Sequence, residues 1–318
     1  MAVASTEPGS PAGDAPVDIT IGVVSYNVRP LLERCLHSAE ASLAEIGGGT
    51  LVVIDNASHD GSVDLVRERF PNVHLIASTE NLGFGAGCNL ALAQASVGGA
   101  ILWLNPDAEL MPGALPALLG ALEADPSIAL VGPLVTYPDG RPQPTRRRFP
   151  TRRDLAIEGT PLEWRGVARS FLNRYYCLDR NEEAEPVDWL SGACLLGRVD
   201  ALRRLGGFSA NFFMYFEEVD LAQRLAAYGW TIWYEPGARV AHHQSQSADQ
   251  NIAAKERHYY GSKYRYASRY FGRTAAKALR LWSAGLFAAE LAVQRARGDA
   301  MLVRRYDALV RWHLRDVA

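Results

Sequence analysis

The chain has 318 residues, 48% hydrophobic and 21% charged, as in a globular protein with room for one large or two modest domains. Its formal net charge of -2 excludes the strong overall basic field of many nucleic-acid-binding proteins, so no nucleic-acid partner is predicted. The four widely spaced cysteines form no CxxC pair, which favours reduced thiols and argues against a zinc-type cysteine cluster.

The N-terminal residues predict neither a signal peptide nor a membrane span. Residues 1–16 are rich in Ala, Pro, Gly and Ser and lack an apolar run, so we expect a disordered tail. No apolar stretch reaches the roughly 20 residues that a bilayer span requires. Residues 281–293 come nearest, and they include Glu290. We therefore expect a cytoplasmic protein.

Strand and helix patterns alternate between residue 18 and about residue 134. Apolar runs predict strands at residues 19–24, 51–54, 73–77 and 101–104. Helices are predicted over residues 30–46, from the turn at 58–62 to residue 70, and over 87–95 and 113–124. This order predicts a mostly parallel sheet flanked by helices, with right-handed crossovers.

The second half of the chain is less regular at first. Residues 133–186 contain the turn signal Pro138-Asp139-Gly140 and a basic run at 146–148, so we expect long loops and short helices near a site. Strands are predicted at residues 189–196 and 231–234, with a helix over 219–228 between them. From residue 251 onward the pattern is helical, with many basic and aromatic residues.

Acidic side chains follow the ends of predicted strands. Asp55 follows the second strand and Asp107 follows the fourth, through Asn105-Pro106. Ligands of α/β proteins bind at the carboxyl ends of parallel strands, so these residues could contact a nucleotide or hold Mg²⁺ beside a diphosphate. The structural alternatives are an Asx turn at Asp55 and a solvated loop acid at Asp107.

Glu217 and Glu218 open a predicted helix after an aromatic run. Acidic residues in a first helical turn stabilise the helix dipole, and Asp220 is spaced for an i,i+4 pair with Arg224. A carboxylate beside apolar walls also has the raised pKa that suits a general base. Further on, His242 and its neighbour are either metal ligands or ordinary surface histidines.

A glycine-rich run from Asn81 to Asn89 precedes another predicted helix. Glycines let a phosphate approach the backbone, and a helix N-terminus favours an anion. A dinucleotide-binding fingerprint is the alternative, because Asp107 lies about 20 residues beyond Gly87. The spacing is Gly-x-Gly-x-Gly and a strand–helix unit precedes it, so a dinucleotide-dependent oxidoreductase rests on a weak signal.

Taken in order, these segments resemble the inverting glycosyltransferases of family 2, which have the GT-A fold. Within that family they are most similar to bacterial rhamnosyltransferases of cell-wall linker and O-antigen synthesis. The resemblance covers residues 18–247 and rests on Val24-Ser25-Tyr26-Asn27, Asp55-Asn56-Ala57-Ser58-His59-Asp60-Gly61-Ser62, Asn81-Leu82-Gly83-Phe84, Asn105-Pro106-Asp107, Trp189-Leu190-Ser191-Gly192-Ala193, Glu217-Glu218-Val219-Asp220-Leu221 and His242-His243. It implies a Rossmann-like GT-A catalytic domain over residues 17–250 and a helical C-terminal extension over 251–318.

The resemblance implies donor and metal contacts. The residues that would hold the nucleoside, ribose and phosphates are Ser25, Tyr26, Asp55, Asn81, Gly83 and Asn105. Asn105 and Asp107 occupy the place of the family's Asp-x-Asp motif, with Asp107 and His242 reaching Mg²⁺ or Mn²⁺. Because Asn105 replaces the first acid of that motif, metal affinity is expected to be lower or to rest more on His242.

The same resemblance implies an acceptor side. Glu218 would be the base that deprotonates the acceptor hydroxyl, at a position where Asp is commoner in the family. The residues that would line the sugar or acceptor pocket are Trp189, Ser191, Gly192 and Glu217. If Glu217 points at the site instead, the base shifts by one residue.

The implied reaction is inverting transfer of a sugar, with L-rhamnose from dTDP-rhamnose favoured, onto a cell-wall or polyprenyl-diphosphate-linked saccharide. The alternatives are another hexosyl or galactofuranosyl transferase that uses a UDP-sugar, and a nucleotide-sugar-binding module without catalysis. Residues 251–318 are either a basic element at the inner face of the cell membrane or a helical cap with solvated charges.

Overall fold

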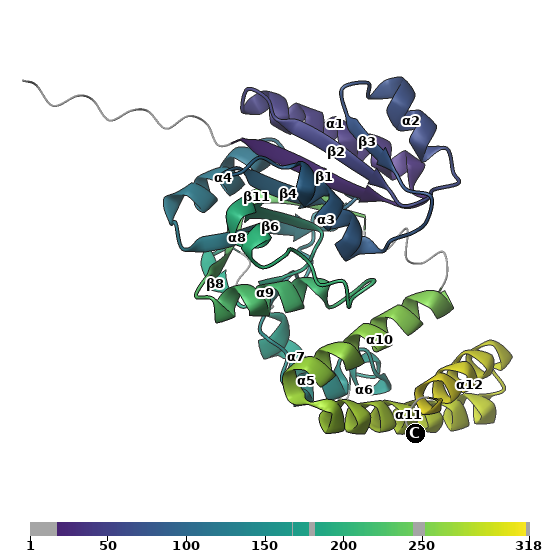
Figure 1. The fold of residues 1–318 in the computed structure, drawn as a ribbon. Helices are drawn as coiled ribbons and strands as arrows, with labels where there is room; N and C mark the ends of the chain where they lie inside the picture. The colour runs from purple at the N-terminus through teal and green to yellow at the C-terminus, as the bar shows by residue number, and fades with distance from the viewer. Residues whose placement is uncertain (1–17, 167, 178–181, 244–251, 316–318) are drawn as a thin grey trace, which may run out of the picture.

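The computed structural model describes residues 18–166, 168–177, 182–243 and 252–315. The predicted disordered tail of residues 1–16 lies outside these ranges. Within them, a central sheet with flanking helices forms the upper part of Figure 1, and a group of helices lies below it.

A nine-stranded sheet forms the centre of the fold. Its order is β3 (His74–Ala77), β2 (Thr50–Asp55), β1 (Ile19–Ser25), β4 (Ala100–Leu104), β10 (Cys194–Arg198), β6 (Ile128–Thr136), β11 (Thr231–His242) and β5 (Ala108–Leu110), with β8 (Glu185–Val187) paired to β11 off this path. β10, β5 and β8 run against their neighbours, and the other strands share one direction. The predicted α/β class with a mostly parallel sheet is therefore confirmed.

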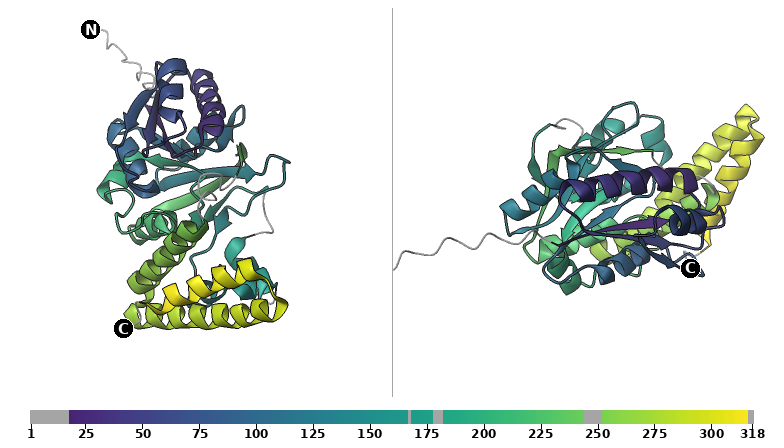
Figure 2. Two further views of the ribbon diagram at one scale, coloured as in Figure 1. Left: turned by 90° about the vertical axis from the view of Figure 1, so that its right-hand side faces the viewer. Right: turned by 90° about the horizontal axis from the view of Figure 1, so that it is seen from above.

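Alternate residues of each strand supply two apolar cores, one on each face of the sheet. Ile21 and Val23 of β1 belong to the core formed with α1 (Arg29–Glu45), α2 (Ser62–Arg69) and α4 (Ala114–Ala124). Val24 of β1 and Trp103 of β4 belong to the core formed with α3 (Phe84–Gln94), α8 (Val199–Arg204) and α9 (Glu217–Ala227). The two views of Figure 2 show these helices above and below the strands.

Several strands differ from their predicted extents. The strand expected over residues 189–196 is two: β9 (Trp189–Leu190) pairs with β7 (Arg146–Arg147) in a separate small sheet, and β10 begins at Cys194. β11 continues past Tyr234 to His242 through an irregularity between Glu235 and Arg239, which carries its end to β5. β6 and β5 were not predicted, and β6 contains Gly132 and Pro133, residues that are typical of turns.

The C-terminal helices α10 (Ile252–Phe271), α11 (Arg273–Arg297) and α12 (Ala300–Leu314) pack beside the short helices α5 (Arg152–Ile157), α6 (Pro161–Trp164) and α7 (Arg169–Tyr176), as Figure 2 shows. Phe287 of α11 is fully buried and contacts the rings of Tyr260, Tyr306 and His313. The predicted helical C-terminal region is confirmed. Among the described residues, no helix combines the length and apolar character that crossing a membrane requires.

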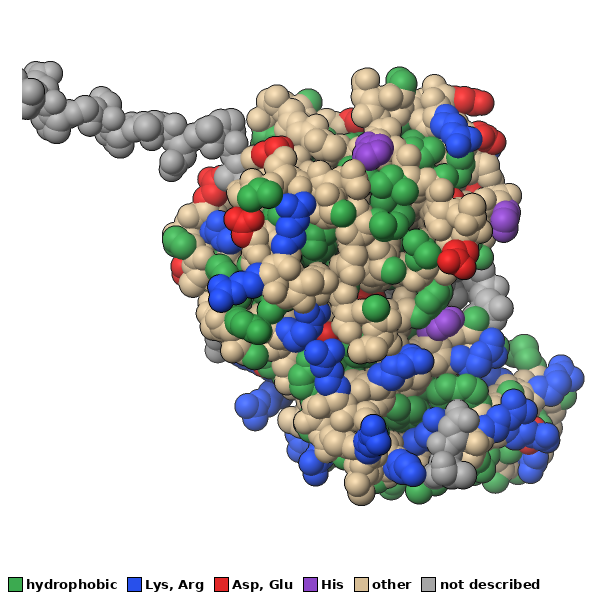
Figure 3. Space-filling model, viewed as in Figure 1, with side chains coloured by type: hydrophobic (Ala, Val, Ile, Leu, Met, Phe, Trp, Pro, Cys, Tyr) green, Lys and Arg blue, Asp and Glu red, His purple; other side chains and the backbone are tan. Residues whose placement is uncertain are grey.

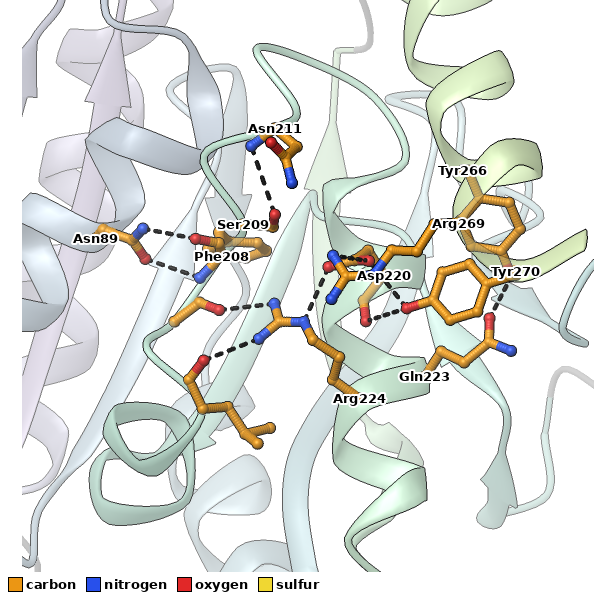
Figure 4. Close-up of polar contacts among 12 residues, drawn as sticks. Asn89, Phe208, Ser209, Asn211, Asp220, Gln223, Arg224, Tyr266, Arg269 and Tyr270 are labelled. Atoms are coloured by element: carbon orange, nitrogen blue, oxygen red, sulfur yellow. Dashed lines mark hydrogen bonds and ion pairs between the residues drawn. The ribbon is translucent and has the colours of Figure 1, made fainter. Parts of the chain in front are cut away.

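A buried carboxylate joins α9 to α10 (Figure 4). Asp220 is fully buried, and its side chain pairs with Arg224 at 2.9 Å, which confirms the predicted i,i+4 pair. The other carboxylate oxygen contacts Arg269 at 3.0 Å and accepts a hydrogen bond from Tyr270 at 2.9 Å, and both partners lie on α10. Arg224 also donates to the carbonyls of Leu205 and Gly207, so one network connects α10, α9 and the segment after α8.

Replacing Asp220 with Asn should lower the free energy of unfolding by about 3 kcal/mol, because two arginines would lose their buried counter-charge. Urea titration measures this quantity. The matched control, Asp307→Asn, breaks a pair with Arg311 whose side chains are 32% and 72% exposed, and should cost less than about 1 kcal/mol. An equally small loss in both variants would contradict a stabilising role for the network.

Candidate active site

A cavity of about 730 Å³ opens at the carboxyl ends of β1 and β4, a size typical of small-molecule sites. It brings together twelve of the predicted site residues: Ser25, Tyr26, Asn81, Gly83, Asn105, Asp107, Trp189, Ser191, Gly192, Glu217, Glu218 and His242. Asp107, which follows β4, and Glu218, in the first turn of α9, therefore share one cavity. Asp55 is the predicted site residue that does not line it.

The end of β2 lies behind the cavity wall. Asp55 is 1% exposed and pairs in register with Ser25 of β1. One carboxylate oxygen of Asp55 accepts the backbone N–H of Ser58 at 2.8 Å, so the Asx turn is present. The second oxygen of Asp55, the Ser25 hydroxyl and the side-chain carbonyl of Asn56 are buried without a hydrogen-bond partner in the described residues. Unpartnered buried polar groups are costly, so they indicate a place where a polar ligand binds.

The glycine-rich run packs elements together. Gly83 has a φ of +86°, and an added Cβ would lie 2.3 Å from the carbonyl oxygen of Phe213. At Gly87, a Cβ would lie 2.7 Å from Val24, so this glycine lets α3 approach β1. The run thus holds α3 and the 212–216 segment near the strand ends, and its spacing reflects packing instead of a dinucleotide fingerprint.

Asp107 and His242 meet at the end of β4. The imidazole Nε2 of His242 lies 3.2 Å from an oxygen of Asp107 and 3.5 Å from the amide nitrogen of Asn105. Gln143 was not predicted as a site residue. It donates to the His242 carbonyl at 2.7 Å, so its side-chain oxygen faces Nδ1 of His242 at 2.9 Å. This assignment puts the ring proton on Nδ1 and aims the lone pair of Nε2 at the carboxylate.

Nε2 of His242 and the facing carboxylate oxygen of Asp107 are both electron-rich, so together they suit a cation. The Asn105 side-chain oxygen is buried without a partner and is a third possible donor. Within the described ranges, no three or more His, Cys, Asp or Glu side chains gather as a metal site, so the protein alone offers a partial donor set. Such a set fits Mg²⁺ or Mn²⁺, because these ions keep waters and substrate phosphates as further ligands.

Glu217 and Glu218 begin α9 after two residues with left-handed backbone, Tyr215 at φ +68° and Phe216 at φ +67°. An oxygen of Glu218 accepts the Gly192 N–H at 3.1 Å, and a Cβ at Gly192 would lie 2.7 Å from that oxygen. Burial raises the pKa of Glu218, and the Gly192 N–H opposes this shift. Glu217 is 2% exposed with one oxygen unpartnered, and its pKa is raised well above the ordinary value by burial and then by the charge of Glu218.

The cavity wall also contains residues that were not predicted as site residues. Trp189 is fixed there by its indole N–H, which donates to the Arg148 carbonyl at 2.9 Å. The missed lining residues include Arg147, Glu158, Tyr175, Lys255, His258 and Tyr259. The basic run at 146–148 was the one local sequence signal for any of these residues. The residues from α10 reach the cavity only through tertiary packing, which a local pattern does not predict.

Solved structures share this architecture. A mannosyltransferase from Pyrobaculum calidifontis, PcManGT in complex with GDP-Man and Mn²⁺, has a TM-score of 0.52 at 20% identity, over 95% of this chain and 84% of that one. GalNAc-T7 with UDP, GalNAc and Mn²⁺ has a TM-score of 0.53 at 15% identity, over 73% of this chain and 44% of that one. The sheet, its helices and these likenesses define a protein with the GT-A fold.

Sequence relationships narrow this class. The family model "Glycosyl transferase family 2" matches residues 20–206, and "Glycosyl transferase family group 2" matches residues 163–298. The chain belongs to glycosyltransferase family 2, which confirms the resemblance and rules out the oxidoreductase alternative. N-acetylglucosaminyl-diphospho-decaprenol L-rhamnosyltransferase of Mycobacterium tuberculosis is 35% identical over 259 residues, 77% of this chain and 82% of that protein. Rhamnosyltransferase WbbL of Escherichia coli is 31% identical over 83 residues, 26% of this chain and 31% of that one.

Proposed function

We propose that this protein is an inverting glycosyltransferase that moves L-rhamnose from dTDP-rhamnose to a saccharide carried on polyprenyl diphosphate. Family membership supplies the reaction class. The name of the mycobacterial relative, which states L-rhamnosyl transfer and a diphospho-decaprenol carrier, supplies the favoured sugar and acceptor. The observation that carries the proposal is that the Asp107–His242 pair and the Glu218–Gly192 pair line one cavity.

The donor occupies the strand-end side of the cavity in this proposal. Ser25, Tyr26 and Asp55 bind the nucleoside, and Asn81 and Gly83 lie beside the ribose and phosphates. The unpartnered Ser25 hydroxyl, which lines the cavity, supports this placement because it gains a partner when a ligand binds. The contact with Asp55 stays a prediction, since its unpartnered oxygen is buried behind the cavity wall.

Asp107, His242 and the side-chain oxygen of Asn105 would hold Mg²⁺ or Mn²⁺. When bound, the ion supplies positive charge next to the departing diphosphate. Gln143 keeps the proton of His242 on Nδ1, so that Nε2 remains a donor atom. The structures of PcManGT and GalNAc-T7 contain Mn²⁺, so Mn²⁺ is the ion to test first.

Glu218 removes the proton from the acceptor hydroxyl. The hydroxyl oxygen then bonds to the anomeric carbon on the face opposite the nucleotide, while the bond to the diphosphate oxygen breaks and dTDP leaves. One displacement inverts the anomeric configuration and needs no enzyme nucleophile. Trp189 and Ser191 line the acceptor side, and Gly192 holds the carboxylate of Glu218 in place.

The C-terminal helices suit an anionic membrane surface, where a polyprenyl carrier resides. Residues 251–318 hold 14 Lys and Arg against 5 Asp and Glu, although the whole chain has a net charge of -2. Figure 3 shows Lys and Arg gathered over these helices in the lower part of the molecule. Arg273, Lys277 and the exposed Leu281 follow one another at four-residue intervals on α11, which gives one face both basic and apolar groups. This location would be the cytoplasmic face of the cell membrane.

In the presence of Mn²⁺, dTDP-rhamnose should raise the melting temperature more than UDP-sugars or GDP-mannose do. A ligand at 100 times its Kd adds about 2.7 kcal/mol of stability. Asp107→Asn should abolish the part of this rise in melting temperature that depends on Mn²⁺. The control Asp139→Asn, at a turn side chain that is 52% exposed, should leave the rise unchanged. A larger shift with a UDP-sugar would instead assign a hexosyl or galactofuranosyl transferase. Donor binding without transfer to any acceptor would favour a binding module.

Glu218→Gln should lower kcat by about 10²- to 10⁴-fold, the usual contribution of a general base, without changing donor binding. Because the ionised form is active, the rate should fall as pH drops through the raised pKa of Glu218, above the ordinary glutamate value of about 4.3. Glu217→Gln is the matched control with an equivalent change. A larger loss in Glu217→Gln would move the base by one residue.

The full-length chain should sediment with phosphatidylglycerol vesicles and not with phosphatidylcholine vesicles. The double variant Arg273→Glu, Lys277→Glu should weaken binding at least about tenfold, because each cation near an anionic surface contributes about 1 kcal/mol. The control, Arg67→Glu with Arg141→Glu, makes the same charge change at exposed sites elsewhere. Equal weakening by both pairs would show that total charge, and not the α11 face, determines binding.

A further inference from the structure

Arg146 and Arg147 are adjacent on β7 and point to opposite sides. Arg146 is 2% exposed and has partners: it pairs with Glu185 at 2.6 Å and donates to the Cys177 carbonyl at 2.9 Å. Arg147 lines the cavity instead. An alternating strand therefore sends one arginine into a structural ion pair and the other into the candidate active site.

Aromatic rings enclose the Arg147 guanidinium. Its central carbon lies 4.4 Å from the ring centre of Tyr176, 5.3 Å from that of Trp189 and 5.5 Å from that of Tyr175. These cation–π contacts, together with the nearby Tyr176 hydroxyl, hold the planar group in one place. The side chain is 16% exposed, so the guanidinium is largely removed from water.

The charge of Arg147 is only partly balanced. The nearest carboxylate oxygen, on Glu158, lies 3.6 Å from Nη1, beyond hydrogen-bond distance. Tyr175 donates its hydroxyl to the same carboxylate, and burial raises the pKa of Glu158, which weakens it as a counter-ion. Within the described residues, neither Nε nor Nη1 of Arg147 has a hydrogen-bond acceptor. A sequestered guanidinium with unused donors is suited to a phosphate, which accepts two parallel N–H bonds.

The position of Arg147 favours the acceptor over the donor. The segment from Gln143 to Arg147 runs along the cavity. Gln143 contacts His242 at its start, and Arg147 pairs with Trp189 at its end. Between them, the Thr145 carbonyl accepts the N–H of Ser191. Arg147 is therefore at the end away from the Asp107–His242 pair. Lys255 and His258 of α10 also line the cavity.

We propose that Arg147 forms an anion subsite for the phosphate attached to the reducing end of the acceptor sugar. The acceptor class is therefore a glycosyl diphosphate linked to a lipid, and a free saccharide lacks the group that Arg147 binds. This inference rests on the proposed function, since it assigns the substrate class of the same cavity.

Initial rates with two soluble acceptors test the subsite: N-acetylglucosaminyl diphosphate carrying a short prenyl chain, and an octyl N-acetylglucosaminide without phosphate. Arg147→Met should raise the KM for the diphosphate acceptor about ten- to a hundredfold, the range for a lost charge-assisted hydrogen bond. The KM for dTDP-rhamnose should stay unchanged. The rate with the octyl glycoside should change by a clearly smaller factor, which reflects only the higher pKa of Glu218 once the Arg147 charge is gone. The control Arg148→Met, at a 48% exposed side chain of the same run, should change neither KM.

A change that affects both acceptors equally would overturn the subsite and assign Arg147 a structural pair with Glu158. A KM that rises for dTDP-rhamnose instead would assign the guanidinium to the donor diphosphate and also overturn the proposal. If Arg147→Met does not fold, Arg147→Lys keeps the charge and loses the two-pronged geometry, and its KM for the diphosphate acceptor should still rise.

Calorimetric titration with inorganic pyrophosphate in EDTA separates this inference from the proposed function. Without a divalent cation, pyrophosphate should bind the native chain and bind Arg147→Met at least about tenfold more weakly. Binding that depends on Arg147 in a chain that transfers no rhamnose would support the subsite and refute the proposed reaction. Rhamnosyl transfer with no effect of Arg147 on pyrophosphate binding or on KM would support the proposed reaction and refute the subsite.

Discussion

The geometry of the cavity depends on the buried carboxylate of Asp220. It lies two residues beyond Glu218 on α9, and its partners Arg269 and Tyr270 lie on α10, the helix that carries Lys255, His258 and Tyr259 along one wall. Because a buried charge must be paired, these contacts hold α9 and α10 in a fixed relation. Helix α10 is in this way part of the cavity wall.

Two close approaches fix the rest of the cavity. Gly83 leaves room for the Phe213 carbonyl, and Gly192 leaves room for the Glu218 carboxylate. Each contact joins a loop at a strand end to the segment that opens α9. The Asp107 side and the Glu218 side of the cavity are thereby held at one separation, because each of these contacts leaves no room for a side chain in between.

Much of the fold followed from local pattern, because buried parallel strands are continuous apolar runs and their helices have a clear period. β6 was missed because Gly132 and Pro133 resemble a turn, although Pro133 lies opposite the irregular part of β11. Most of the predicted site residues line the cavity, since strand ends are where ligands collect. Gln143 and Arg147 were not predicted as site residues, because their positions come from contacts with residues about 100 and about 40 positions away. A sequence pattern read along the chain contains no such pairing.

The adjacent carboxyl groups at the start of α9 are chemically unequal, and the difference bears on the choice of base. Consecutive helical residues point about 100° apart, so a single N–H donor serves only one of them. Gly192 serves Glu218, which favours its ionised form, whereas Glu217 keeps one oxygen unpartnered in a nearly closed site. Two neighbouring charges in a poorly solvated place are unfavourable, so a proton resides preferentially on Glu217. An ionised Glu218 beside a neutral Glu217 is the arrangement that a proton acceptor for the incoming hydroxyl requires.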